Sequence, residues 1–181
     1  MTDPSPVGHA AARPWGATRL PNIDPELSRL VLGTMTFGDT VDAGTAAQML
    51  DVALDGGITA VDTANAYAGG RTEEILAELL PGRRDRILLA TKAGMPHADC
   101  GDDPPLSPRG LKAALEGSLA RLQVDHVDLL YLHQPDRRTP LADTLGAVAE
   151  LVTGGTVGGW VSRTSPPGRS ARPCGRPIAR T

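Results

Sequence analysis

Short apolar segments alternate with amphipathic segments four times along this chain of 181 residues, and a fifth apolar segment follows. Each repeat takes roughly 30 residues, the length of one strand–helix unit. Strands without polar alternation, separated by amphipathic helices, are typical of a parallel sheet covered by helices. The alternation therefore predicts an α/β fold built on a parallel sheet.

The boundaries of the expected elements follow from apolar runs and helix caps. Strands are expected at the five apolar runs 30–33, 58–61, 87–90, 127–132 and 157–161. Asp42 can cap the first helix, and Ser107 and Thr139, each followed by proline, can cap the last two. The second helix opens at residue 72 with two glutamates in its first turn, where a helix N-terminus favours negative charge. Apolar stripes are expected to face the core from Leu111, Leu115, Leu119 and Leu122 on the third helix and from Leu141, Leu145, Val148 and Val152 on the fourth.

Two architectures share this alternation, the doubly wound sheet and the (β/α)₈ barrel. The first strand–helix junction, residues 33–38, reads Gly-Thr-Met-Thr-Phe-Gly. It lacks the G-x-G-x-x-G pattern of dinucleotide-binding sheets, which disfavours the doubly wound answer. We therefore expect a partial (β/α)₈ TIM barrel, comprising the first four βα units and a fifth strand.

The composition changes at both ends of the chain. Residues 1–25 are rich in Pro, Ala and Gly without periodicity, and we expect a flexible N-terminal arm there. Residues 26–162 carry the alternating pattern and form one expected domain. Residues 163–181 contain arginines and prolines but almost no large apolar side chains, which predicts a disordered tail. A basic interaction tail and a shifted reading frame both fit, and the frameshift is favoured because the pattern is lost inside an expected strand.

Charge and hydropathy exclude several classes of partner. A formal net charge of −3 gives no reason to expect a nucleic-acid or anionic-membrane partner. No apolar run approaches the roughly 20 residues that a membrane helix needs. The N-terminus lacks the basic-then-apolar pattern of a signal peptide, so a cytoplasmic location is expected. The two cysteines lie outside metal-binding spacings, and no metal site is predicted.

Polar residues interrupt the apolar runs at the ends of three expected strands. Asp62 and Tyr67 follow the second strand, Lys92 ends the third, and His133 ends the fourth. Each has an ordinary structural interpretation, as a turn cap, a loop aromatic, a solvated charge or a strand-end histidine. However, the active site of a parallel barrel lies at the C-terminal ends of its strands. Their joint occurrence at that rim, in adjacent units, favours a catalytic site.

The chemistry of these four groups is mutually consistent. A lysine ammonium near a tyrosine hydroxyl stabilises the phenolate, which makes Tyr67 a usable proton donor. Asp62 would keep Lys92 charged and aimed, and His133 would orient the substrate oxygen. Carbonyl reduction needs a proton delivered to oxygen and a hydride delivered to carbon. The four residues supply no hydride, so a nicotinamide cofactor is implied.

The segments that hold these residues resemble the aldo-keto reductase family over roughly residues 28–155. The matching pieces are residues 32–35, 61–67, 90–92 and 131–136, with 118–122 and 135–145 most similar to the aflatoxin-aldehyde and succinic-semialdehyde reductase branch. The family's catalytic Asp, Tyr, Lys and His map onto Asp62, Tyr67, Lys92 and His133. The resemblance implies NADPH as the cofactor and small-molecule aldehydes or ketones as substrates.

The resemblance also implies where the cofactor is held and where this chain departs from the family. Its cofactor contacts correspond to Gly33, Thr34, Met35 and Asp62. Ser162 matches the serine of a Ser-Asn pair that holds the nicotinamide carboxamide, but an arginine follows it where asparagine is expected. Counterparts of strands six to eight, which bind most of the cofactor, are not found.

A five-stranded piece of a barrel has two open edges, whose unpaired backbone groups favour self-association. Exposing roughly a few hundred Å² of apolar area at about 25 cal/mol per Å² forgoes several kcal/mol, against the roughly 5–15 kcal/mol that stabilise a typical domain. We therefore expect the chain alone to be marginally stable or aggregating and to lack reductase activity. A non-catalytic remnant, or a binding or regulatory module that retains the tetrad, are the alternatives.

Overall fold

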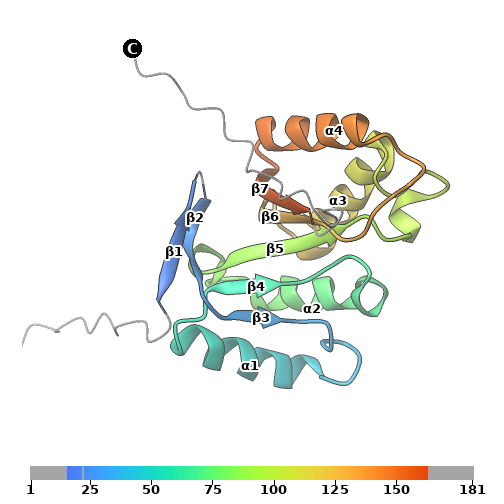
Figure 1. Ribbon diagram of the computed structural model, residues 1–181. Helices are drawn as coiled ribbons and strands as arrows, with labels where there is room; N and C mark the ends of the chain where they lie inside the picture. Colours follow the sequence, from blue (N-terminus) through green and yellow to red (C-terminus); the bar gives the residue numbers. More distant parts are fainter. Residues whose placement is uncertain (1–15, 22, 163–181) are drawn as a thin grey trace, which may run out of the picture.

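The computed structural model describes residues 16–21 and 23–162 (Figure 1). Its elements, with η for a 3-10 helix, are β1 (Ala17–Leu20), β2 (Ile23–Ser28), β3 (Val31–Gly33), α1 (Ala43–Asp55), β4 (Ala60–Asp62), η1 (Tyr67–Gly70), α2 (Arg71–Leu79), η2 (Arg84–Arg86), β5 (Leu88–Ala93), η3 (Ala98–Cys100), α3 (Pro108–Leu122), β6 (Val127–Leu132), α4 (Leu141–Thr153) and β7 (Val157–Ser162). The predicted tail, 163–181, and the first 15 residues of the predicted arm lie outside the described residues.

Strands β3 to β7 form one parallel sheet in the order β3-β4-β5-β6-β7. Helices α1 to α4 connect successive strands and lie along the outside of the curved sheet (Figure 1). A doubly wound sheet would instead reverse its strand order at a switch point. The sequential order confirms the predicted partial barrel.

Two of the three predicted helix caps are confirmed, and one is wrong. Asp42 Oδ1 accepts the Thr45 amide at 2.8 Å, and Ser107 Oγ accepts the Gly110 amide at 3.1 Å. At α4 the expected cap, Thr139, instead donates its hydroxyl to Asp136 Oδ2 at 2.8 Å. Helix α4 instead begins one residue later than expected, with Pro140 at its N-cap position, and proline offers no side-chain acceptor for a cap.

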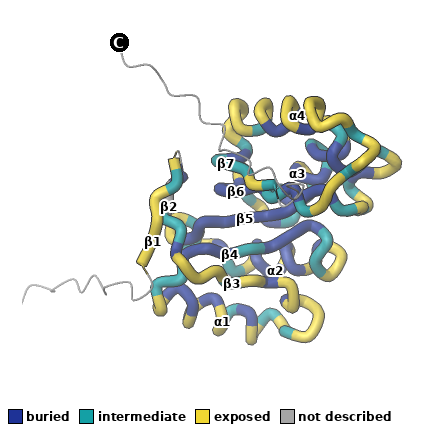
Figure 2. The backbone as a smooth tube through the Cα atoms, viewed as in Figure 1, coloured by how far each residue is buried: buried dark blue, intermediate teal, exposed yellow. Residues whose placement is uncertain are grey.

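The core has an outer and an inner layer, and β5 is buried at all six of its positions. The outer layer lies between the sheet and the helices and includes Leu89 and Leu130 from the strands and Leu76 and Leu115 from the helices. The inner layer is the small cluster Ile23, Leu88, Ala90 and Leu129. In Figure 2 the central strands β4 to β6 are dark along most of their length, whereas β3 and the outer sides of α1 and α4 are exposed.

The N-terminal hairpin of β1 and β2 corrects the predicted arm, which was expected to be irregular up to residue 25. The two strands pair antiparallel, and Ile23 packs into the inner core layer. Ser28 Oγ accepts the amides of Thr59 at 2.9 Å and Ala60 at 3.1 Å, so the hairpin also fixes the start of β4. The sequence concealed β2 because it carries Pro25, which weakens a strand prediction.

The apolar stripe predicted on the fourth helix is the other correction. The side chains of α4 that face the core are Thr144, Ala147 and Val148. Leu141 is 68% exposed, and Leu145 and Val152 are also exposed. At the opposite edge Val31 and Val52 are exposed as well. Among the described residues, exposed apolar side chains therefore lie on β3 and α1 at one end of the sheet and on α4 at the other.

Candidate active site

The C-terminal ends of β4, β5 and β6 meet at one rim of the sheet. Parallel pairing places Asp62 beside Ala90, and Lys92 beside Tyr131. His133 directly follows β6, and its amide donates to the Ala93 carbonyl at 2.7 Å, which extends the β5–β6 pairing by one residue. The strand ends therefore bring three of the four predicted catalytic side chains to neighbouring positions.

Lys92 is the centre of the site. Its side chain is only 3% exposed, so its ammonium needs partners within the protein. It donates to Asp62 Oδ2 at 2.6 Å, to the Tyr67 hydroxyl oxygen at 2.7 Å and to the Thr63 carbonyl at 3.0 Å. These three bonds use the full donor capacity of an ammonium. The lysine side chain is therefore held in one orientation.

Tyr67 reaches Lys92 from a tight loop between β4 and α2. The three residues after it all have positive φ: Ala68 at 47°, Gly69 at 63° and Gly70 at 98°. A non-glycine residue in this region stores strain of about 1–3 kcal/mol and persists only where its surroundings hold it. The loop turns the phenol back over the end of β5, with Lys92 Nζ 4.5 Å from the ring centroid.

His133, directly after β6, brings an imidazole ring next to the phenol. Its ring lies edge-on to the Tyr67 ring, with 6.4 Å between centroids and an interplanar angle of 88°. The loop behind it is anchored by Asp136, which accepts the amides of Leu106 and Arg138 and the Thr139 hydroxyl. Burial raises the pKa of the Asp136 carboxyl, but these hydrogen bonds outweigh it and keep that pKa below its ordinary value.

The arrangement can deliver a proton to an oxygen at the rim. The ammonium donates to a lone pair of the Tyr67 oxygen, which leaves the phenolic hydrogen free to point toward a substrate. As that proton leaves, the ammonium stabilises the developing phenolate. Tyr67, Asp62, Lys92 and His133 are thus brought together as expected.

The residues assigned to the cofactor lie at the same rim, on three strands. Gly33 ends β3, and Met35, just beyond it, is 63% exposed. Thr34 is buried, and its hydroxyl donates to the Asp62 carbonyl at 3.0 Å, so its side chain supports β4. Ser162 ends β7 in register with Leu132.

The fit of a nicotinamide to this rim can be judged from Asp62. Its Oδ2 is taken by Lys92, whereas its buried Oδ1 has no hydrogen-bond partner within the described part of the chain. A buried carboxylate oxygen without a donor is costly, and a hydroxyl or amide of a bound ligand would satisfy it. The residues present therefore fit the polar end of a nicotinamide nucleoside.

The described residues contain no group of three or more potential metal ligands. None of the described helices has the length and apolar character that a membrane-spanning segment needs.

Sequence reasoning missed a second charged cluster, on the outer side of β5. Glu73 is completely buried, although the sequence suggested only a favourable first-turn charge. Its carboxylate accepts from Thr91 Oγ1 at 2.7 Å and from Arg121 Nε at 2.9 Å, and Arg121 also binds Asp99 through both terminal nitrogens. The cluster draws its members from β5, α2, η3 and α3, so periodicity within any one element could not have paired them.

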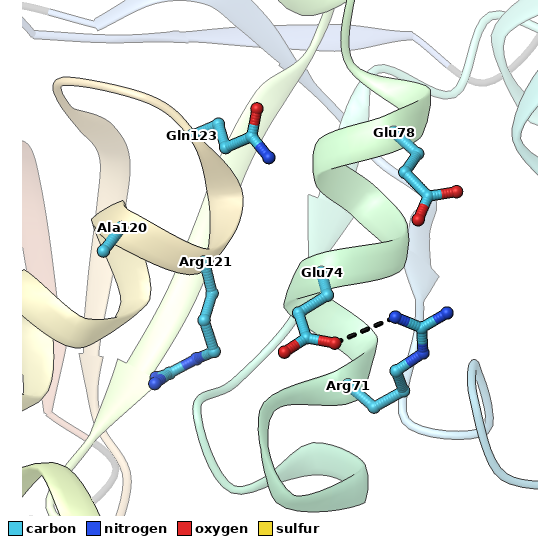
Figure 3. A pocket seen from close by; sticks show the side chains of 6 residues that line it. All are labelled: Arg71, Glu74, Glu78, Ala120, Arg121 and Gln123. Carbon is cyan, nitrogen blue, oxygen red and sulfur yellow. Dashed lines mark hydrogen bonds and ion pairs between the residues drawn. The ribbon is translucent and has the colours of Figure 1, made fainter.

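A shallow hollow lies beside this outer cluster, between α2 and α3, and it is lined by Arg71, Glu74, Glu78, Ala120, Arg121 and Gln123 (Figure 3). The exposed Arg71–Glu74 ion pair, 2.9 Å long, crosses one side of it. None of the four rim residues contributes to this hollow, so it is separate from the candidate active site.

Comparison with known proteins gives one consistent family. The sequence pattern described as the Aldo/keto reductase family matches residues 29–164. An uncharacterized oxidoreductase of Bacillus subtilis, YrpG, is 42% identical over 142 residues, which cover 72% of this chain and 44% of that protein. Aflatoxin B1 aldehyde reductase member 2 of Rattus norvegicus is 37% identical over 152 residues, covering 80% of this chain and 40% of that protein.

A solved structure agrees with the sequence matches. The aldo-keto reductase AKR11C1 from Bacillus halodurans, in its holo form, superposes with a TM-score of 0.70 and 33% identity, over 81% of this chain and 50% of that one. The chain thus spans about half, or less, of the length of the proteins that it matches.

Proposed function

The chain belongs to the aldo/keto reductase family, and from this premise we propose that its rim site serves the reduction of small aldehydes or ketones to alcohols with NADPH. Family membership makes the chain an oxidoreductase homologue; the cofactor, the substrate class and the activity are the proposal. A cytoplasmic location belongs to the same proposal.

The observation that carries the proposal is the contact of Lys92 Nζ with both the Tyr67 hydroxyl, at 2.7 Å, and the Asp62 carboxylate, at 2.6 Å. An ammonium fixed in this way favours loss of the phenolic proton to a substrate oxygen. General acid catalysis of this kind contributes typically 10²–10⁴-fold to a rate, as an order of magnitude.

The other rim residues have supporting roles. His133 lies edge-on to Tyr67 and can hydrogen-bond the same substrate oxygen. Asp62 Oδ1, Gly33, Thr34, Met35 and Ser162 would hold the nicotinamide end of NADPH, which supplies the hydride when bound. Two similar proteins, an aflatoxin B1 aldehyde reductase and an aldo-keto reductase solved in its holo form, support this substrate class and the need for a cofactor.

The chain of 181 residues is proposed to be inactive by itself and to self-associate. Its described sheet has five strands, whereas a closed barrel has eight. In the described sheet β3 and β7 are the outermost strands, and they carry the exposed Val31 and Val161; edge strands of this kind favour association. Sedimentation at several concentrations tests this: association is expected, and a monomer that turns over NADPH would contradict it.

The reductase proposal is tested in a fusion of residues 16–162 to the part of YrpG that follows its matched region. We expect this fusion to oxidise NADPH in the presence of a simple aldehyde. The chain has two lysines, which provide a matched pair of variants. Lys92→Met should abolish turnover, whereas Lys112→Met, which breaks an exposed pair with Glu150, should retain it.

The outcomes separate the alternatives. A folded fusion that binds NADPH without turnover would favour a binding or regulatory module. A fusion that neither binds NADPH nor turns over would favour a non-catalytic remnant. Turnover that is equal in both lysine variants would refute the role of the rim site.

A further inference from the structure

The outer charged cluster is built as a closed network around Arg121. Its guanidinium donates to Glu73 Oε2 at 2.9 Å and to the two oxygens of Asp99 at 3.0 and 2.8 Å. Asp99 in turn contacts His97 Nδ1 at 2.9 Å. The Arg121 and Asp99 side chains are only 18% and 15% exposed, and Glu73 is fully buried. A network buried to this extent fixes the relative positions of η3, α2 and α3.

Arg121 also supports the strained loop that carries Tyr67. A Cβ atom built on Gly70 would lie 2.8 Å from Arg121 Cδ and 3.0 Å from its Nε, so the loop backbone rests directly on this side chain. Gly70 lies two residues after Ala68, and the positive φ of Ala68 persists only if the surrounding structure maintains it. The side chain that binds Glu73 and Asp99 therefore also packs against the backbone of the Tyr67 loop.

The same network reaches the strand that carries Lys92. Glu73 Oε1 accepts the hydroxyl of Thr91, which is buried and directly precedes Lys92 in β5. Successive side chains of a strand point to opposite faces, so Thr91 is held on the outer face while Lys92 projects to the inner one. From the outer face of the sheet, the cluster thus supports both the loop that carries Tyr67 and the strand that carries Lys92.

We propose that Arg121 is a positioning residue for the Tyr67–Lys92 pair, acting from the outer, helix-covered face of the sheet. The inference rests on the proposed function for its catalytic meaning. Arginine suits the task because its planar fork serves two carboxylates at once, which an ammonium on a flexible stem does not reproduce.

Hydrogen exchange of the complete chain, read by mass spectrometry, tests the proposal without cofactor or turnover. In Arg121→Met, amides of residues 63–72 should exchange at least about tenfold faster, since the loop opens locally. Peptides from β6 and β7 should keep their wild-type rates. Arg121→Lys should be intermediate, because it retains one charged contact. Arg83→Met, which removes an arginine bound to Asp51 far from the loop, should leave residues 63–72 unchanged.

Two glycine variants test the contact without removing a charge. Gly70→Ala and Gly69→Ala both place a Cβ on a backbone of positive φ, but only the former meets Arg121, since nothing lies within 4 Å of a Cβ at Gly69. Gly70→Ala should reproduce the exchange pattern of Arg121→Met, and Gly69→Ala should show a smaller change. If Arg121→Met fails to fold, Glu73→Gln combined with Arg121→Met avoids the unpaired buried carboxylate and reports on the same loop.

Several results would overturn the proposal. Unchanged exchange in residues 63–72, equal acceleration in every strand, or equal effects of the two glycine variants would each do so. In the catalytically competent fusion, Arg121→Lys should lower kcat with KM within about twofold, because the side chain does not reach the rim. An inactive wild-type fusion with the predicted exchange pattern would refute the proposed function alone. Turnover with an unaffected loop would refute this inference alone.

Discussion

The inner and outer faces of β5 carry two charged clusters that differ in whether they are complete. Lys92 on the inner face is bonded to Asp62 and Tyr67, yet one Asp62 oxygen has no partner among the residues that the structure describes, and the phenol is partly exposed. On the outer face every carboxylate oxygen of Glu73 and Asp99 is matched by a donor. The incomplete cluster has room for a ligand, whereas the complete one can only hold the structure in place.

The energetics of buried ion pairs explain why the two clusters should respond differently to mutation. A buried pair adds little net stability compared with apolar residues, but removing one partner costs about 3–5 kcal/mol because the other charge stays buried. The partly open inner cluster should lose activity when it is altered, and the sealed outer cluster should lose stability. The following predictions test that contrast.

The largest effect is expected for Tyr67→Phe in the fusion. Loss of the proton donor should lower kcat by roughly 10²–10⁴-fold, while the midpoint of thermal unfolding stays near that of the unmodified fusion. Stopped-flow or steady-state oxidation of NADPH measures the first quantity, and circular dichroism the second. A large drop in the melting temperature would mean that the inner cluster is structural, which would remove the contrast.

Glu73→Ala should reverse the pattern. It leaves the Thr91 hydroxyl and Arg121 Nε without their acceptor, although Arg121 keeps Asp99, so the free energy of unfolding should fall by about 1–3 kcal/mol. The matched control is the next residue: Glu74→Ala breaks the exposed pair with Arg71 and should cost about 0–1 kcal/mol. Urea denaturation of both variants provides the comparison. Equal losses of unfolding free energy in the two variants would show that the outer cluster stabilises the protein no more than an exposed ion pair does.

The loss of stability at acidic pH should depend on Asp99. Burial raises the pKa of its carboxyl, but hydrogen bonds and charge from Arg121, with a contribution from His97, outweigh it and hold that pKa below the ordinary value. A depressed pKa contributes stability that is present above the unfolded value of about 3.9 and is lost as the pH falls through the folded value. The stability gap between the wild type and Asp99→Asn should therefore be widest near neutral pH and shrink below about pH 4. Urea midpoints at pH 7 and pH 3 measure this gap, and a constant gap would contradict it.

The smallest effect is expected for Arg83→Met. Arg83 binds Asp51 at 2.9 Å, but both side chains are substantially exposed, at 32% and 52%. Such a pair contributes about 0–1 kcal/mol. If the free energy of unfolding falls by more than this in the same urea titration, solvent exposure does not explain why some ion pairs of this protein matter more than others.

The inner cluster and the sheet were predictable from the sequence because each leaves a local pattern. Lys92 and His133 end apolar runs, and the C-terminal ends of parallel strands must share one rim. The Asp42 and Ser107 caps were equally local. The outer cluster was not predictable, since the contact of Glu73 with Arg121 joins two helices that are distant in sequence. Thr139 misled for a local reason, because α4 begins one residue later, with Pro140 at the N-cap position, and the Thr139 hydroxyl donates to Asp136.

The β1–β2 hairpin and the exposed stripe of α4 show a further limit of prediction from the sequence. The strand β2 contributes one buried apolar anchor, Ile23, to the inner core, which is too little to register as alternation. The apolar spacing on α4 predicted a buried stripe, yet Leu141 and Leu145 are exposed in the described part of the chain. Periodicity reports which residues share a helix face, and it does not report whether a neighbour covers that face.

The most direct test is the fate of deuterium from NADPH that carries deuterium at both hydrogens of the nicotinamide C4, followed by mass spectrometry of the alcohol that the fusion forms from a simple aldehyde. The account predicts deuterium on the carbinol carbon, and at least about 100-fold slower labelling in Tyr67→Phe. Unlabelled alcohol, or labelling at the same rate with phenylalanine at position 67, would contradict it.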